Sequence, residues 1–142
     1  MAMKTKIFLL SFLLALFTFN LSAQSLQKGN LIGTHTLTVT LKPGVTMEQY
    51  INFTIEKWIP AFVSVHPGWQ CYVVRSVRGE APKDSFGLIF IVNSEKDRDL
   101  FFTPDGHDSE TGKAAFQKIQ PIYDELLKLA DVDDKYTDWV VI

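Results

Sequence analysis

The feature that most limits how this chain can fold is an unbroken apolar run over residues 86–92, Phe-Gly-Leu-Ile-Phe-Ile-Val. A strand with one face in water alternates apolar and polar side chains, whereas a continuously apolar strand is covered on both faces. We therefore expect residues 86–92 to form a strand with helices of the same chain on one side. A second subunit would cover the other side, since the chain supplies no further element for it.

The first half of the fold is expected to be a strand followed by a helix. Strict alternation over 32–41 predicts a strand with His35 on its apolar face and threonines on the other. Thr46 and Gln49 form a capping-box pattern that begins a helix. Pro60 should disturb that helix near its preceding residue. The apolar stripe of the helix is Ile51, Ile55, Trp58, Ile59 and Phe62.

The second half supplies the remaining strands and helices. A strand is expected over 69–77, a loop over 80–84, and a helix capped by Ser94. A longer helix follows, bent at Pro121, with the apolar stripe Phe116, Ile119, Tyr123, Leu126 and Ala130. Residues 131–134 are acidic and are expected to be a solvated loop before a last strand over 139–142. The order β-α-β-β-α-β predicts an α+β, ferredoxin-like antiparallel sheet with both helices on one face.

The N-terminus has the pattern of a signal peptide. Lys4 and Lys6 precede an apolar run over 7–19, which is too short to span a bilayer comfortably, and Ala23 is a small residue suited to cleavage. We expect a signal peptide over 1–23, a flexible tail over 24–31 and one domain over 32–142. The mature protein would be exported, either periplasmic or secreted; a retained N-terminal anchor is the alternative.

Charge and cysteine content exclude several classes of protein. Cleavage leaves 12 of the 14 basic side chains against 16 acidic ones, a net charge of −4, so nucleic-acid binding lacks its usual electrostatic source. Cys71 is the single cysteine, which excludes a disulfide scaffold and a zinc site built on paired cysteines. Within its apolar strand, Cys71 is expected to be a small buried hydrophobe. No membrane segment is expected after the leader.

Several short motifs together resemble the dimeric α/β-barrel superfamily over residues 32–142. The first two are His35 at the head of the first strand and the turn Leu-Lys-Pro-Gly-Val over 41–45. The third is the segment 59–68, which begins with Ile-Pro and ends with Pro-Gly, followed by Val74 and Arg75. The fourth is Asp-Leu-Phe-Phe-Thr-Pro-Asp-Gly-His over 99–107. This superfamily includes antibiotic-biosynthesis monooxygenases, EthD-like and NIPSNAP-like proteins and stress-responsive barrel proteins. The resemblance implies a homodimer in which two sheets meet as a barrel.

The resemblance also implies a pocket between the sheet and the helices, with His35 and His107 in positions that can line it. A neutral imidazole in an apolar pocket can act as a general base near neutral pH, so these two residues are the candidate catalytic residues. The alternatives are a hydrogen-bonded histidine at the rim for His35 and a solvent-exposed loop histidine for His107. The sequence departs from the superfamily at Leu100, where a tyrosine would be convenient, and has an extra residue before His107.

The candidate ligand-binding residues are aromatic or polar side chains near this pocket: Trp58, Phe62, Tyr72, Arg75, Phe86 and Phe101. The tryptophan and the phenylalanines, together with Phe90, would form an aromatic wall for a planar ligand, or they are plain core. Either Tyr72 or Arg75 would be a polar group that binds the ligand; the alternative for Arg75 is an intersubunit ion pair. Neither a metal site nor a cofactor is expected, because the phosphate-loop, nucleophile-elbow and zinc-helix motifs are missing from the sequence.

Two functions from different classes follow. The first is an exported dimeric barrel that binds a small apolar or aromatic molecule, with monooxygenase-like or cyclase/isomerase-like activity that needs no cofactor. The alternative is a non-catalytic stress or assembly protein whose barrel core is filled. The sequence leaves open whether the protein is an enzyme.

Overall fold

The computed structural model describes residues 25–79 and 85–142; the expected signal peptide over 1–23 and the expected loop over 80–84 lie outside these residues. In chain order the elements are β1 (Leu31–Leu41), α2 (Met47–Phe53), η2 (Thr54–Trp58), α3 (Ile59–Val65), β2 (Gln70–Arg75), β3 (Phe86–Val92), α4 (Glu95–Asp99), α5 (Glu110–Leu127) and β4 (Ala130–Val140).

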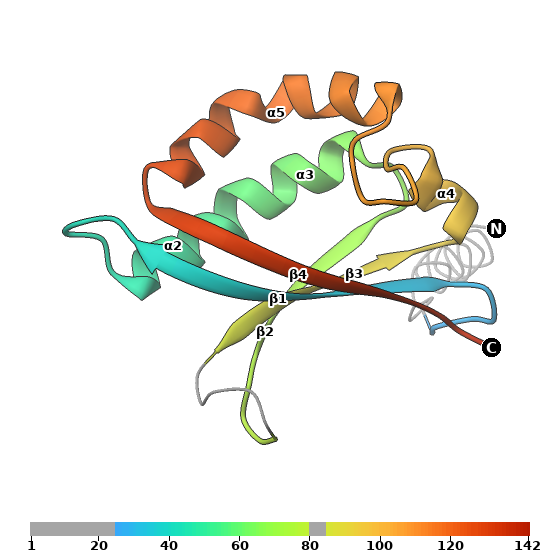
Figure 1. Ribbon diagram of the computed structural model, residues 1–142, viewed down its shortest axis with the longest axis horizontal. Coiled ribbons are helices and arrows are strands. Elements are labelled where there is room, and N and C mark those ends of the chain that lie inside the picture. The colour runs from blue at the N-terminus through green and yellow to red at the C-terminus, as the bar shows by residue number, and fades with distance from the viewer. Residues whose placement is uncertain (1–24, 80–84) are drawn as a thin grey trace, which may run out of the picture.

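The strands form one sheet in the order β2-β3-β1-β4, and each neighbouring pair is antiparallel. The helices α2, α3 and α5 all lie over the same face of this sheet (Figure 1). The first helical stretch connects β1 to β2, and α5 connects β3 to β4, as in the split β-α-β arrangement. The predicted ferredoxin-like α+β fold class is therefore confirmed.

Strand β1 has the predicted alternation. Leu31 and Leu37 are buried on the helix-facing side, and the threonines point to the other side. The strand begins at Leu31, one residue before the predicted start. Just before it, the backbone N–H of Gly29 donates to Val141 O (2.8 Å) and the Val141 N–H donates to Asn30 O (2.9 Å), which ties the end of the tail to the end of β4.

The first helix begins with the predicted capping box at Thr46 and then changes its winding. Segment η2 is π-helical: the N–H of Ile59 bonds back five residues to Thr54 O, directly before Pro60, whose ring cannot donate the α-helical bond. The predicted disturbance near Ile59 is thus confirmed.

The predicted apolar stripe of this helix is partly wrong. Tyr50 and Thr54 are 2% exposed and line up with Trp58 and Phe62, whereas Ile55 is 48% exposed. The wider π-helical turn changes the angle between successive side chains, so it brings the row at 50, 54, 58 and 62 onto the sheet. Thr54 tolerates burial because its hydroxyl donates to Tyr50 O (2.8 Å).

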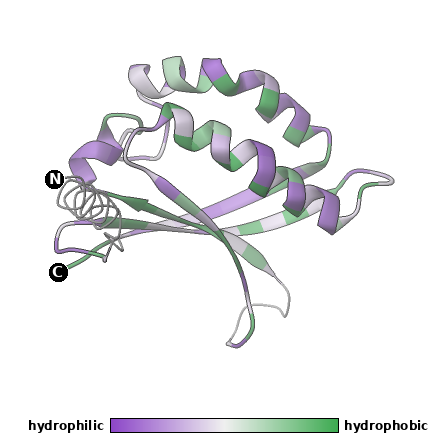
Figure 2. Ribbon diagram, turned by 180° about the vertical axis from the view of Figure 1, so that it is seen from behind, coloured by the Kyte–Doolittle hydropathy of each residue, from purple (hydrophilic) through white to green (hydrophobic). Residues whose placement is uncertain are grey.

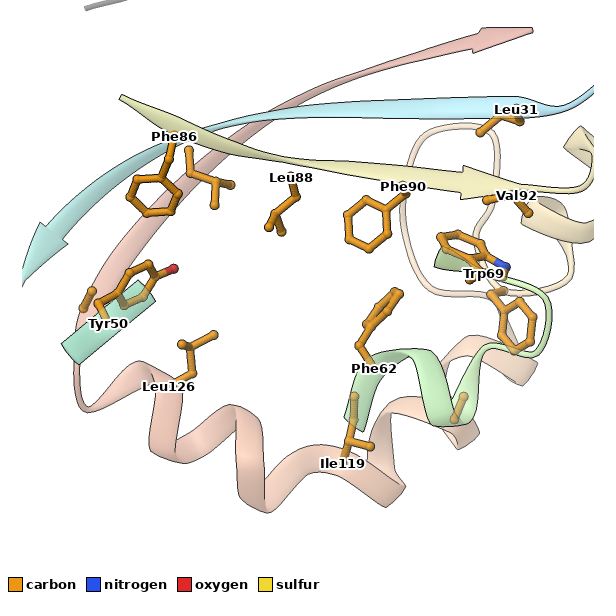
Figure 3. Close-up of a cluster of buried hydrophobic side chains, with 14 residues drawn as sticks. Leu31, Tyr50, Phe62, Trp69, Phe86, Leu88, Phe90, Val92, Ile119 and Leu126 are labelled. Atoms are coloured by element: carbon orange, nitrogen blue, oxygen red, sulfur yellow. The ribbon is translucent and has the colours of Figure 1, made fainter. Parts of the chain in front are cut away.

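The core lies between β3 and the helices. Phe86, Leu88 and Phe90 point from β3 toward Tyr50, Leu126 and Phe62 of the helical layer (Figure 3). Both long helices alternate hydrophilic and hydrophobic segments along their length, as expected for helices with one face on a core (Figure 2). Of the stripe predicted for α5, Ile119 and Leu126 are buried; Phe116 and Tyr123 are half-buried and pack on each other, with ring centroids 4.9 Å apart.

The opposite face of the sheet carries an apolar patch. Ile89 and Ile91 of β3 lie there beside Ile32 of β1, with Tyr72 and Trp139 on the two outer strands. Tyr72 is 50% exposed and Trp139 is 58% exposed. Within the described ranges the chain places no element over this face (Figure 1).

The predicted acidic loop over 131–134 is wrong. Strand β4 begins at Ala130 and runs to Val140, pairing residue by residue with the whole of β1, from Leu41 opposite Ala130 to Leu31 opposite Val140. Ala130, which was expected on the helix, is fully buried at the start of this strand. Continuous pairing outweighs the low strand propensity of the aspartates, because strand preference depends mostly on context.

Among the described residues, no helix combines the length and the apolar character that crossing a membrane requires.

Candidate functional site

A cavity of about 240 Å³ lies between the helix-facing side of the sheet and the helical layer. Its lining comes from β1, η2, α3, the turn before β2, β3, α4, the loop after α4, and β4. The lining residues are Leu31, Gly33, His35, Trp58, Phe62, Trp69, Leu88, Phe90, Val92, Arg98, Phe102, Gly106, Asp134, Tyr136 and Asp138.

One wall of the cavity is polar because of the register of β4 on β1. Side chains two residues apart on a strand share a face, so Asp134, Tyr136 and Asp138 all point to the helix side. They lie opposite Leu37, His35 and Gly33 of β1, respectively. A carboxylate, a phenol and a second carboxylate therefore stand in a row beside the histidine.

His35 and Asp134 form a hydrogen-bonded pair in this wall. The Nδ1 atom of His35 lies 2.7 Å from Oδ2 of Asp134. A carboxylate only accepts hydrogen bonds, so Nδ1 is the donor; in the neutral form of the ring, Nε2 then keeps its lone pair. The side chains are 20% and 42% exposed, respectively, so this polar pair remains in contact with water at the cavity wall.

Aromatic rings fix the plane of the His35 ring. The Phe90 ring meets it edge-on, with centroids 4.8 Å apart, and the Tyr136 ring stacks on it at 5.6 Å with an interplanar angle of 22°. The carboxylate sets the rotation of the imidazole and the two rings set its tilt. Such positioning is what a general base needs, since its efficiency depends on geometry before basicity.

Gly33 lies next to Nε2 of His35 in the cavity wall. A side-chain carbon added at Gly33 would lie 3.5 Å from Nε2 of His35 and 3.2 Å from Oδ1 of Asp138. Glycine at this position keeps the cavity wall next to Nε2 free of a side chain.

An ion pair between a buried arginine and a partly exposed aspartate lies at one end of the polar wall. Arg98, at 8% exposure, places Nε 3.2 Å from Oδ2 of Asp138, and its Nη1 donates to the carbonyl oxygens of Phe102 (3.2 Å) and Thr103 (2.7 Å). A buried charge is retained only when it is paired and hydrogen-bonded. The pair thus connects α4 and the following loop to β4.

The other wall of the cavity is aromatic and aliphatic. Trp58 stacks on Phe62, with centroids 5.1 Å apart, and Phe62 packs against Phe90 at 5.3 Å. Trp69 meets Phe62 and Phe90 edge-on at 5.8 and 5.9 Å. A chamber with one apolar wall and a few polar groups on the other is the usual composition of a small-molecule site.

The structure brings together only part of the residues predicted for the site. His35, Trp58 and Phe62 line the cavity. Phe86 and Phe101 are buried in the core outside this lining; Phe101 packs on His66.

The other three predicted residues lie away from the cavity. Tyr72 is on the opposite face of the sheet, where its hydroxyl donates to Oε1 of Gln70 (2.6 Å). Arg75 is exposed at the end of β2. The His107 side chain is 84% exposed in the loop before α5 and lies 3.8 Å from Asp105, although its neighbour Gly106 does line the cavity.

The sequence-based reasoning missed the polar residues at 98, 134, 136 and 138. The signal was present in the alternation of Asp134, Tyr136 and Asp138, which has the period of a strand. This alternation was overlooked because residues 131–134 were interpreted as a loop. Arg98 carried no such signal, because its burial depends on Asp138 lying across from α4.

Two further titratable groups, one half-buried and one buried, lie away from the cavity's polar wall. Burial raises the pKa of the Cys71 thiol to about 12; the side chain packs against the core as predicted, but it is half-buried rather than buried. Burial lowers the pKa of His66, although its bond to Phe62 O (2.8 Å) and the charge of Asp108 oppose this. Within residues 25–79 and 85–142, no group of three or more His, Cys, Asp or Glu side chains is placed to hold a metal ion.

Comparison with known proteins gives similarity at the level of structure only. No protein-family profile matches the chain. No curated protein sequence matches it either.

Among solved structures, the chain is similar to SnoaB, a cofactor-independent oxygenase from Streptomyces nogalater, with 13% identity, coverage of 77% of this chain and 91% of that one, and a TM-score of 0.44. It is also similar to a dimeric protein of unknown function and ferredoxin-like fold from Bacteroides fragilis, with 11% identity, coverage of 80% and 97%, respectively, and a TM-score of 0.42.

Proposed function

We propose that this protein binds a small apolar or aromatic molecule between the sheet and the helices, and that His35 acts on it as a general base. The observation that carries the proposal is the 2.7 Å hydrogen bond from His35 Nδ1 to Asp134 in the wall of a cavity. This bond leaves the lone pair of Nε2 available, and Gly33 leaves room for a ligand beside it.

The size of the cavity supports a ligand of one or two rings. A cavity of roughly 150 Å³ lined by apolar side chains holds benzene, and this one measures about 240 Å³. Drug-sized ligands occupy pockets of about 300 Å³ or more. The part of the ligand held in this cavity is therefore larger than benzene and smaller than a typical drug.

The chemistry proposed is removal of a proton from an O–H or an activated C–H of the ligand. Nε2 takes the proton, and Asp134 stabilises the imidazolium that forms. The ligand is left as an anion, which is the species that cofactor-independent oxygenation, isomerisation or cyclisation begins from. The proposed activity is one of these classes, and it uses no cofactor.

The alternative function, a stress or assembly protein with a filled core, requires the space between sheet and helices to be occupied by side chains. The cavity favours ligand binding over this alternative. An Asp-bound histidine is also unnecessary in a purely structural core.

The test is calorimetric titration with 1-naphthol, a planar two-ring phenol, on the wild type, His35→Gln and His107→Ala. We expect His35→Gln to weaken binding by about tenfold or more, which corresponds to ~1.4 kcal/mol. His107→Ala should bind as the wild type does, because its side chain lies in solvent. Equal affinity of the wild type and His35→Gln, or no binding by the wild type, would refute the proposal.

We also propose that the protein is a homodimer joined through the open face of the sheet. The half-buried Ile89 and Ile91 lie there between the exposed Tyr72 and Trp139. An apolar patch across a sheet is a common sign of an interface. Light scattering should give a dimer at micromolar concentration and a monomer for Ile89→Glu; a monomeric wild type would contradict this.

Export to the periplasm or the exterior is proposed from the leader pattern over 1–23. N-terminal sequencing of protein recovered from its own host should begin at Gln24. A chain that keeps Met1 would show that the segment is retained.

A further inference from the structure

A second cavity, of about 170 Å³, lies next to the first. Trp58, Leu88 and Asp134 line both cavities. The remaining lining of the second cavity comes from β1, α2, η2, α5 and β4: Leu37, Tyr50, Thr54, Tyr123, Leu126, Leu127, Ala130 and Val132. The two cavities are therefore separated by single side chains from η2, β3 and β4.

The indole of Trp58 is the largest part of this partition, and it is held by packing rather than by a hydrogen bond. It stacks on Phe62 at 5.1 Å. Its Nε1 is buried and has no hydrogen-bond partner among the described residues. Because Nε1 has no partner, a shift of the ring breaks no hydrogen bond. A buried donor without a partner is also unfavourable, so the present position of the ring gains nothing from this N–H.

Most of the lining of the second cavity is apolar; its polar groups are the phenols of Tyr50 and Tyr123, the Thr54 hydroxyl and the Asp134 carboxylate. Its leucines and Val132 are aliphatic, and the Thr54 hydroxyl is already engaged with Tyr50 O. Burial raises the pKa of Tyr50, so its phenol is neutral near pH 7. Asp134 is the one charged residue of this lining, and its Oδ2 already accepts from His35.

We infer that the second cavity is a subsite for the aliphatic tail of a ligand whose aromatic head lies at His35. The tail passes between Trp58, Leu88 and Asp134, where a methylene chain fits more easily than a ring. The inference rests on the proposed function, since it takes the head group to be at His35. With this subsite, the protein distinguishes ligands by the length of their aliphatic tail.

The test uses phenols with a 4-alkyl chain, from 4-ethylphenol to 4-hexylphenol, measured by calorimetry. Each buried methylene is worth about a threefold to fourfold gain in affinity. Val132, which is 37% exposed, reaches the second cavity from the solvent side, so Val132→Phe fills the cavity with little cost to the fold. The matched control is Val140→Phe, on the same face of β4 at 41% exposure, lining neither cavity.

We expect wild-type affinity to rise with chain length by at least about tenfold over the series. In Val132→Phe the rise should disappear while 4-ethylphenol binds as before, and Val140→Phe should behave as the wild type. Leu127→Trp, which enters the same cavity from α5, replaces Val132→Phe if that variant melts early.

The outcomes separate the two proposals. The subsite is overturned if affinity rises with chain length equally in the wild type and in Val132→Phe, or if affinity does not rise at all. In both cases, binding of 4-ethylphenol by the wild type leaves the proposed function intact. If 4-ethylphenol does not bind, or binds equally to His35→Gln, the proposed function fails and the subsite fails with it.

Discussion

His35 and Asp134 are 99 residues apart in the sequence, yet their side chains meet at 2.7 Å because β4 pairs with the full length of β1. The residue directly opposite His35 is Tyr136, and Asp134 lies two positions further along the same face. Diagonal neighbours on one face of an antiparallel pair are within reach of long side chains. A shift of the register by one residue would turn Asp134 to the opposite face of the sheet.

Asp134→Asn should remove the base without unfolding the protein. The amide nitrogen of asparagine can donate to Nδ1, which moves the imidazole proton to Nε2 and eliminates the available lone pair. We expect 1-naphthol affinity to fall by about tenfold, with an unchanged melting temperature. Asp133→Asn is the control, because Asp133 lies opposite Thr38 on the other face; equal losses in both variants would assign the effect to charge alone.

Two glycines on neighbouring strands should respond differently to alanine. Gly33→Ala places a methyl group 3.2 Å from Oδ1 of Asp138, which must move by a few tenths of an ångström, and 3.5 Å from Nε2 of His35. The variant should therefore fold and bind 1-naphthol at least several-fold more weakly. Gly87→Ala would bring its methyl group into the carbonyl oxygen of His35, so it should lower the melting temperature. Thermal melts and calorimetry on the two variants distinguish these effects, and a Gly33→Ala protein with wild-type affinity would contradict the assigned position of the ligand.

Stability should fall as the pH is lowered from about 6.5, because of His66. Its pKa is lowered in the folded state by burial, so below pH 6.5 the unfolded chain takes up a proton that the native protein does not. The free energy of unfolding then decreases with decreasing pH, by at most ~1.4 kcal/mol per pH unit for one proton. The decrease levels off below the folded-state pKa.

The measurement is urea unfolding between pH 5 and 7 on the wild type, His66→Gln and His107→Gln. The slope of stability against pH should flatten in His66→Gln and persist in His107→Gln, whose side chain is exposed. The slopes are compared rather than the absolute stabilities, since His66→Gln also loses packing against Phe62, centred 3.9 Å away. An unchanged slope in His66→Gln would contradict the assignment.

Cys71 should be inert in the native protein. With a pKa of about 12, about one thiol in ten thousand is ionised at pH 8, and the thiolate is the reactive form. Iodoacetamide should therefore label the protein only in denaturant, as mass spectrometry would report. Rapid labelling of the native protein would show that Cys71 is more accessible than the structure indicates.

The parts of the fold that could be predicted from sequence were those with a local cause. The alternation in β1, the capping box at Thr46 and the apolar run of β3 each depend on neighbouring residues, and each was found in its place. The π-helical winding that buries Thr54 and exposes Ile55 was not evident, since it changes the period on which such predictions rest.

The site depended more strongly on distant residues. His35 could be proposed from its strand, but Asp134 becomes its partner only through the pairing of β1 with β4. The aspartates of 131–134 have low strand propensity by themselves, so the local pattern favoured a loop. The motif 99–107 suggested His107, whereas the structure places its side chain in solvent and puts Gly106 in the lining.

The most direct test of the central claim is a long-range ¹H–¹⁵N NMR spectrum of the His35 ring during titration with 1-naphthol. The account predicts that, in the free protein, Nδ1 is protonated and Nε2 is not, and that the Nε2 resonance moves toward that of a protonated nitrogen as 1-naphthol saturates the site. A proton on Nε2 in the free protein, or an Nε2 resonance unmoved at saturation, would contradict it.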